Sequence, residues 1–272
     1  MARVHLWEWE DLPWVPKVFR DFITDNLHFL FTAFGLFNPV AGMINDCLQR
    51  LRADQIVDLC SGGGGPLPAL MDELRNDFDA TPQVLLTDLY PNELAFSRLA
   101  QKTSGQVRGR IEPTSAFDAP ADLGAFRTIF TGLHHFRPEG ARKILEDAAQ
   151  KGVGIGAFEA QERRLTTILL VPFAVFFSSL LFTPFAGRMT LSRFLFTYLI
   201  PLCPLVYAWD GFVSCLRTYS VRELADLVRD IDSPHYHWDI GQIRARGPFG
   251  FPYRITYLIG MPENHATSSG PA

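Results

Sequence analysis

The sequence predicts an α/β fold in which helices cover both faces of one mostly parallel sheet. Two observations carry this prediction. Between residues 54 and 160, short apolar runs alternate with helical patterns, as in right-handed βαβ units. After residue 235, two further apolar runs with strand-like alternation close the chain, so seven strands are expected.

Each element follows from its local pattern. Strands are expected at 55–60, 83–88, 107–112, 126–131, 152–159, 236–246 and 252–261. Helices are expected at 66–78, 92–102, 138–150 and 219–231. Pro66 and Pro138 suit a first helical turn, where a missing N–H costs nothing. Ser220 and Glu223 have the spacing of a capping box at the start of the last helix.

Three segments lie outside this alternating pattern. Residues 1–53 precede the sheet and are predicted to form a helical cap, so the main domain is expected at 54–262. Residues 165–187 and 194–209 carry no charged side chain, and they predict an apolar helical hairpin at about 165–215, inserted after the fifth strand. The tail at 263–272 is small and polar and is expected to be disordered.

The apolar hairpin allows three interpretations. As a helix, 165–187 would be about 34 Å long, enough to cross a bilayer core of about 30 Å. Both ends of the insertion belong to one sheet, so a single span is excluded. The prolines at 172, 184, 201 and 204 would leave backbone groups that lipid cannot satisfy. A shallow monotopic hairpin, a two-span hairpin and a buried pair lining an apolar cavity of a soluble protein remain open.

Composition excludes several classes of protein. The chain has 25 basic and 29 acidic residues and no long basic block, so nucleic acid is not expected as a partner. The four cysteines form no C-x-x-C pair and no zinc-ligand spacing, which predicts reduced thiols and no metal site. The N-terminus lacks the pattern of a secretory signal, so we expect the cytoplasm or the cytoplasmic side of a membrane.

The segment VDLCSGGGGP, residues 57–66, follows the first strand pattern. A dinucleotide fingerprint would require a third glycine where Leu67 stands, and it fails. The segment instead resembles motif I of the class I S-adenosylmethionine (SAM)-dependent methyltransferases, in which an acid at the strand end precedes spaced glycines. Asp58, Gly62 and Gly64 fall on the acid and the last two glycines, and Cys60 stands where the first glycine is usual.

The resemblance continues along 54–160 and, by topology, over 218–262. It implies a Rossmann-like fold, SAM as the cofactor, and Asp88 at the end of the second strand as the acceptor of ribose hydroxyl hydrogen bonds. Asp118 would lie beside the adenine amine and Phe117 on its ring. The cofactor-binding residues that the resemblance implies are Asp58, Ser61, Gly62, Gly64, Asp88, Leu89, Phe117 and Asp118.

Candidates for catalysis follow the fourth and fifth strands. The LHH sequence at 133–135 is similar to one found there in many small-molecule methyltransferases, so His134 or His135 could act as a general base. Glu159 could bind substrate or instead pair with Arg163 or Arg164. Structural alternatives remain: Asp88 could cap a helix, Asp118 could be a turn residue, and one histidine could be structural. Arg217 and Tyr219 are weaker candidates.

These features predict SAM-dependent methyl transfer to a hydrophobic small-molecule or lipid-like acceptor, with the hairpin as a contact to the membrane surface. One alternative is a non-enzymatic, membrane-associated binding or scaffold protein on the same fold. A second alternative is an NAD(P)-dependent oxidoreductase, which Leu67 disfavours.

Overall fold

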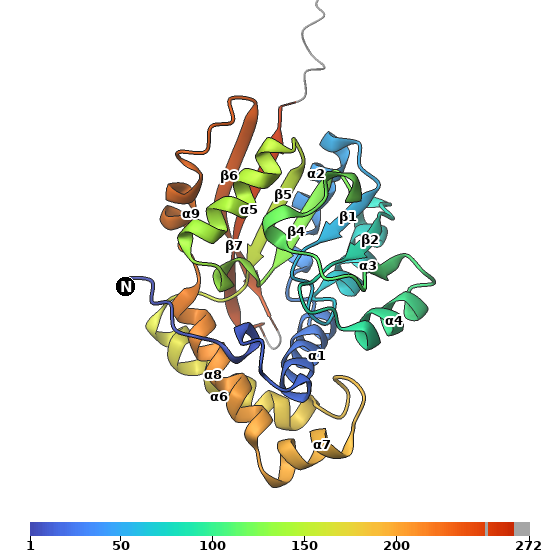
Figure 1. Ribbon diagram of the computed structural model, residues 1–272, viewed down its shortest axis with the longest axis vertical. Coiled ribbons are helices and arrows are strands. Elements are labelled where there is room, and N and C mark those ends of the chain that lie inside the picture. The colour runs from blue at the N-terminus through green and yellow to red at the C-terminus, as the bar shows by residue number, and fades with distance from the viewer. Residues whose placement is uncertain (248–249, 264–272) are drawn as a thin grey trace, which may run out of the picture.

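A seven-stranded sheet forms the centre of the computed structural model, which describes residues 1–247 and 250–263 (Figure 1). The strand order is β3-β2-β1-β4-β5-β7-β6, and β7 runs antiparallel to both of its neighbours. The strands are β1 Gln55–Asp58, β2 Gln83–Leu86, β3 Val107–Gly109, β4 Phe126–Phe130, β5 Gly154–Glu159, β6 Tyr236–Arg246 and β7 Pro252–Pro262. The predicted number of strands and the mostly parallel sheet are therefore confirmed.

Helices cover both faces of the sheet, as expected. One apolar core joins the sheet to α2 (Ala41–Leu51), α3 (Leu67–Phe78) and part of α4 (Glu93–Lys102). A second core lies on the opposite face under α5 (Pro138–Gln150) and α9 (Val221–Val228). The α9 helix is shorter than predicted, but its capping box between Ser220 and Glu223 is present. The expected disordered tail lies outside the described residues, except for Glu263.

The N-terminal region runs across the carboxyl ends of the central strands. Residues 1–16 are mostly extended and contain one short 3-10 turn, Trp9–Asp11, before α1 (Lys17–Ala33) begins. The α1 helix lies directly over the glycine loop: a Cβ on Gly63 would lie 2.8 Å from the Thr24 carbonyl oxygen. The predicted cap is thus two helices preceded by an extended segment, which we call the N-terminal strap (residues 1–16).

The apolar insertion forms a hairpin of α6 (Leu165–Phe182) and α8 (Leu202–Arg217), which lie side by side (Figure 1). Between them, α7 (Leu191–Phe194) continues into a π-helical turn, and the chain bends by 74° before α8. Pro201 precedes α8 and explains this break, since its ring cannot continue a helix. The inner face of the hairpin packs on α1 through Phe22, Ile23, Cys203 and Tyr207.

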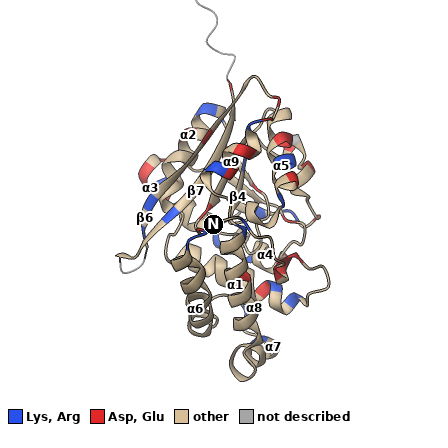
Figure 2. Ribbon diagram, turned by 90° about the vertical axis from the view of Figure 1, so that its left-hand side faces the viewer, with Lys and Arg blue, Asp and Glu red and all other residues tan. Residues whose placement is uncertain are grey.

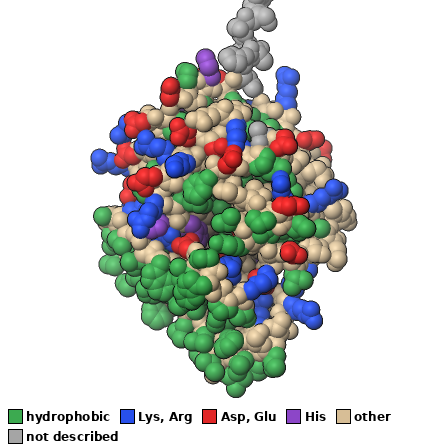
Figure 3. Space-filling model, viewed as in Figure 1, with side chains coloured by type: hydrophobic (Ala, Val, Ile, Leu, Met, Phe, Trp, Pro, Cys, Tyr) green, Lys and Arg blue, Asp and Glu red, His purple; other side chains and the backbone are tan. Residues whose placement is uncertain are grey.

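The outer face of the hairpin is exposed and apolar. Five α6 side chains at four-residue spacing are 56–65% exposed: Leu165, Leu169, Phe173, Phe177 and Leu181. Only 11% of α6 is buried, and α6 is the one helix in the described chain that is long and apolar enough to cross a membrane, or one of up to three if each bent pair counts as a span. Charged residues gather on the sheet domain, whereas α6 has none (Figure 2), and hydrophobic side chains cover the hairpin surface (Figure 3).

Candidate active site

The loop after β1 has the backbone geometry of a glycine-rich ligand loop. Cys60, Gly62, Gly64 and Gly65 all have positive φ angles between 51° and 102°. Cys60, at φ 57°, is in the left-handed region that glycine adopts without cost. This backbone demand explains why the resemblance has a glycine at that position, and it supports the motif register predicted for Asp58 and Gly62.

Replacing Cys60 by glycine is expected to leave the free energy of unfolding nearly unchanged, although glycine favours the φ that the loop imposes. Relief of about 1 kcal/mol of left-handed strain is offset by the greater entropy of the unfolded chain. Cys60→Val should lower the free energy of unfolding by about 1 kcal/mol or more, because a β-branched residue is poorly tolerated in the left-handed region. Urea unfolding of both variants checks this; equal stability of the valine variant would contradict it.

Asp88 follows β2 and faces the loop. Its Oδ2 accepts a hydrogen bond of 2.8 Å from the Gly62 N–H, and its Oδ1 accepts one of 2.8 Å from the Tyr90 N–H. The alternative that Asp88 caps α4 is wrong, since the Asn92 side chain does so. A carboxylate has about four lone-pair sites, so two remain for a ligand.

A cavity of about 450 Å³ lies at the carboxyl ends of β1, β2 and β4, under α1 and the strap. Five of the predicted site residues line it: Ser61, Gly62, Asp88, Leu89 and His135. Further lining residues come from α1 and the strap, and from the β4 end: His5, Glu10, Asp11, Arg20, Asp21, Thr24, Leu27, His28, Phe31, Phe130, Thr131, Gly132 and Phe136. This volume falls in the range of small-molecule sites.

Four residues predicted to bind the cofactor lie outside the cavity wall. Asp58 is 1% exposed and accepts a 2.6 Å hydrogen bond from Thr128 Oγ1; burial raises its pKa to about 7. The Cα of Gly64 lies against Leu99. Phe117 packs edge-on against Phe136 at 5.1 Å.

Asp118 departs furthest from the expectation. Its side chain is 86% exposed and forms a 2.8 Å ion pair with Lys151 at the end of α5. The structure therefore fits the alternative in which Asp118 is a turn residue. It does not place this carboxylate in the cavity.

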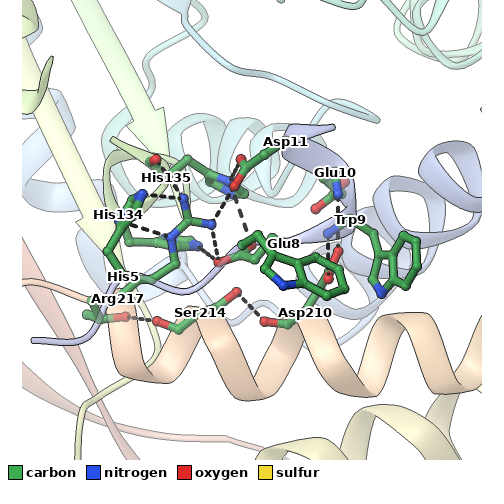
Figure 4. A network of polar contacts seen from close by, with 12 residues as sticks. His5, Glu8, Trp9, Glu10, Asp11, His134, His135, Asp210, Ser214 and Arg217 are labelled. Atoms are coloured by element: carbon green, nitrogen blue, oxygen red, sulfur yellow. Dashed lines mark hydrogen bonds and ion pairs between the residues drawn. The ribbon is translucent and has the colours of Figure 1, made fainter. Parts of the chain in front are cut away.

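The predicted catalytic residues meet in a buried polar network with the strap and α8 (Figure 4). His134 Nδ1 lies 2.9 Å from Glu159 Oε2, so the proposed pairing of Glu159 with Arg163 or Arg164 is wrong. His134 Nε2 lies 3.7 Å from Glu8 Oε1. Both His134 and Glu8 are 1% exposed, so neither side chain reaches the cavity.

The second half of the network faces the cavity. His135 Nδ1 lies 2.8 Å from Asp11 Oδ1, and both residues line the cavity. Arg217 connects the halves, because its Nη1 lies 2.9 Å from Glu8 Oε1 and 2.6 Å from Asp11 Oδ2. Tyr219 donates a 2.7 Å hydrogen bond to the Phe136 carbonyl oxygen, and its ring lies 4.1 Å from the Arg3 guanidinium.

The network sets the charge of its members. Burial opposes the charged form of His134, but Glu159 and Glu8 outweigh it and raise the pKa of His134 to about 9. Burial likewise opposes the Glu8 carboxylate, yet the two histidines and Arg217 lower the pKa of Glu8 to about 2. At neutral pH, His134 is therefore a cation between two carboxylates and cannot accept a proton.

The Asp210 carboxylate anchors the strap to α8. It accepts hydrogen bonds from the backbone N–H groups of Trp9 (2.8 Å) and Glu10 (3.3 Å). Burial raises the pKa of Asp210 to about 8. Burial also raises the pKa of Glu10 well above its ordinary value, since only His135 opposes the nearby carboxylates.

Glu8, His134 and His135 also bring possible metal-ligand atoms within 4.8 Å of one another. The Arg217 guanidinium contacts the same Glu8 oxygen at 2.9 Å, and its positive charge opposes a divalent cation there. The arrangement therefore fits a proton-bearing network better than a metal site.

Sequence reasoning missed Glu8 and Asp11. They lie in an irregular segment with no periodic pattern, and nothing local shows that it folds against the ends of β4 and β5. One signal was available: acidic residues are interleaved with Trp7, Trp9 and Trp14, and carboxylates among large aromatic side chains tend to be buried and paired.

Comparison with known proteins shows the fold. No family model and no curated protein matches the sequence. Among solved structures, the plantazolicin methyltransferase BpumL in complex with SAH matches with 14% identity and a TM-score of 0.53, covering 93% of this chain and 92% of that one. The same enzyme with a monoazolic desmethylPZN analog and SAH matches with 14% identity, a TM-score of 0.52 and coverage of 93% and 92%. An O-methyltransferase family protein from Burkholderia thailandensis has 15% identity, a TM-score of 0.46 and coverage of 83% and 55%. The chain thus has the Rossmann-like fold of the class I SAM-dependent methyltransferases.

Proposed function

We propose that the protein transfers a methyl group from SAM to a small hydrophobic acceptor. The observation that carries this proposal is the cavity at the carboxyl ends of β1, β2 and β4, bordered by the glycine loop and Asp88. In open α/β sheets, ligands bind at this edge. The fold shared with methyltransferases supports the same reaction class.

The residues around the cavity fit the cofactor. Asp88 has free lone pairs for the two ribose hydroxyls, and the loop from Ser61 to Gly63 brings backbone close to a ligand without side-chain obstruction. Leu89 and Tyr90 offer apolar surface beside Asp88. Bound SAM supplies an activated methyl group on a sulfonium, so the protein has to align the acceptor and exclude water.

His135 is the best-placed general base for an acceptor hydroxyl. It lines the cavity, and Asp11 orients its ring through Nδ1, which leaves Nε2 for a proton. Burial opposes its charged form, but Glu8 and Asp11 outweigh it and raise the pKa of His135 above 6.5. The neutral ring, which can accept a proton, is therefore favoured at alkaline pH.

His135→Gln is expected to lower kcat by about a hundredfold or more with a hydroxyl acceptor. It should also remove the rise of kcat with pH above 6.5, because the group that must lose its proton is gone. Asp11→Asn should shift this rise to lower pH, since the ring loses a negative partner. A pH profile identical to that of the unchanged protein would contradict the role of His135.

We infer that the hairpin lies in one leaflet of the membrane rather than spanning it. Its tip is held against α1 by the 2.7 Å ion pair between Arg193 and Asp25, so it does not extend away from the body of the protein. Its inner face covers α1, and its outer face is the exposed apolar surface on α6. Patches of this extent are typical of membrane or protein contacts. A lipophilic acceptor could then reach the cavity from the leaflet.

The test is to fractionate the expressed protein and to incubate membranes with SAM carrying an isotope-labelled methyl group. We expect the protein in the membrane pool and label in an extractable lipophilic compound. Binding of SAM without any transfer would favour the scaffold alternative, and binding of NAD(P) in its place would favour the oxidoreductase.

A further inference from the structure

Two adjoining hollows lie beside the hairpin tip, between α1, α4 and α7. Their volumes are about 400 and 240 Å³, and Asp25 and Arg98 line both. We call them together the basic pocket. Its ionisable lining residues are Asp21, Asp25, His28, Arg98, Lys102, Arg188 and Arg193.

The acidic residues of the basic pocket are already neutralised. Asp25 pairs with Arg193 at 2.7 Å, and Asp21 pairs with Lys17 at 2.9 Å. Burial lowers the pKa of His28, whose Nδ1 lies 2.8 Å from the Gly65 carbonyl oxygen, so this ring is neutral at pH 7.

Three basic side chains of the pocket have no acidic partner within residues 1–247 and 250–263. Arg98, Lys102 and Arg188 are exposed and form no ion pair or hydrogen bond with any residue in the described part of the chain. The lining therefore holds four basic against two acidic side chains, and an anion would complement this excess of positive charge.

Arg193 adds an independent observation. It is 5% exposed and its Cζ lies 5.4 Å from the centroid of the Phe22 ring, yet its Nε and Nη2 atoms have no hydrogen-bond partner among the described residues. Buried guanidinium donors are normally satisfied. The hydroxyls of Thr190 and Ser192 line the same hollow. A phosphate group accepts hydrogen bonds from such donors and favours arginine in particular.

The basic pocket lies at the rim of the exposed apolar surface. Phe185 and Leu191, on the hairpin tip, are 71% and 84% exposed, and Leu94 on α4 is 56% exposed. Lys and Arg side chains lie directly beside the hydrophobic tip (Figure 3). When an apolar face enters a leaflet, the charged residues at its rim lie at the level of the lipid phosphates.

We propose that the basic pocket binds the phosphate of an anionic phospholipid at the membrane surface. The proposal rests on the membrane association inferred above. Asp21 and Asn92 line both this pocket and the active-site cavity, so a bound headgroup would fix the orientation in which the cavity meets the leaflet.

The experiment measures binding of the full chain to vesicles of phosphatidylcholine, with and without phosphatidylglycerol. We compare the unchanged protein with the triple variant R98Q/K102Q/R188Q and with the control R52Q/K143Q/R222Q. The control removes three exposed basic side chains, one just after α2, one on α5 and one on α9, far from the tip (Figure 1). SAM binding by each variant confirms that it has folded.

The unchanged protein and the control should prefer the anionic vesicles by up to about a hundredfold, from roughly fivefold for each of three charges. The pocket variant should lose this preference and keep its binding to phosphatidylcholine. Equal binding of the unchanged protein to both vesicles would overturn the headgroup proposal but leave membrane association intact. Failure to bind either vesicle would overturn both.

Discussion

Asp88→Ala is expected to weaken SAM binding by roughly a hundredfold. The carboxylate would accept two hydrogen bonds from the ribose, and charge-assisted bonds of this kind contribute about 1.5 kcal/mol or more each. The substitution also removes the partner of the Gly62 N–H, which loosens the glycine loop. Isothermal titration calorimetry with SAM measures the loss directly.

Asp118→Ala is the informative comparison for this result. Its carboxylate is exposed, and Lys151 retains a second partner, Asp147, at 2.6 Å. SAM affinity should therefore stay unchanged. If Asp118→Ala weakened binding as much as Asp88→Ala, the adenine contact implied by the resemblance would stand, and the cavity would be only part of the cofactor site.

The sheet domain could be predicted because its information is local. Apolar runs, proline at helix starts and the glycine loop predict the elements, and their alternation predicts right-handed crossovers and a mostly parallel sheet. Asp88 was found for the same reason: a residue at the end of a parallel strand lies at the ligand-binding edge whatever surrounds it. The left-handed backbone at Cys60 follows the same local logic.

The remainder depends on contacts between distant segments. Asp118 comes nine residues after β3 ends at Gly109, and a count of residues does not fix the path of that loop. The hairpin was expected from its composition, but its position against α1 depends on the pairing of Arg193 with Asp25 and on the packing of Phe22 against Tyr207. No periodic pattern encodes such pairs.

Glu8→Gln is expected to lower the free energy of unfolding by about 3 kcal/mol at pH 6, the largest effect on stability that we predict. Glu8 is a buried carboxylate whose Oε1 lies 2.9 Å from Arg217, and it contacts both histidines. Glutamine keeps the shape and removes the charge, so the loss reports the electrostatic part of the interaction. Urea unfolding followed by circular dichroism measures it.

Glu10→Gln is the matched control, two residues away in the same strap. Burial beside Asp210 raises the pKa of Glu10 well above its ordinary value, which favours the neutral carboxyl. The change should therefore shift the unfolding free energy by less than about 1 kcal/mol. Equal losses in the two variants would show that the strap depends on side-chain shape and not on the charge of Glu8.

The pH dependence of stability further separates a role for the charge of Glu8 from a role for the shape of its side chain. His134 has a pKa of about 9 in the fold against an ordinary 6.5, so its stabilising contribution is complete below pH 6.5 and is lost as the pH rises through 9. Asp58 and Asp210 also have raised pKa values, so they too make the protein less stable as the pH rises. The contribution of His134 is therefore found by comparing proteins that share both residues. Glu10 also has a raised pKa and adds to this decrease, so Glu10→Gln lacks that contribution, and between pH 6.5 and 9 Glu8→Gln is compared with the unchanged protein. Glu8→Gln should lose less, because His134 then keeps Glu159 as its single carboxylate partner and its pKa moves back toward 6.5. Parallel losses in these two proteins would show that Glu8 does not hold the proton on His134.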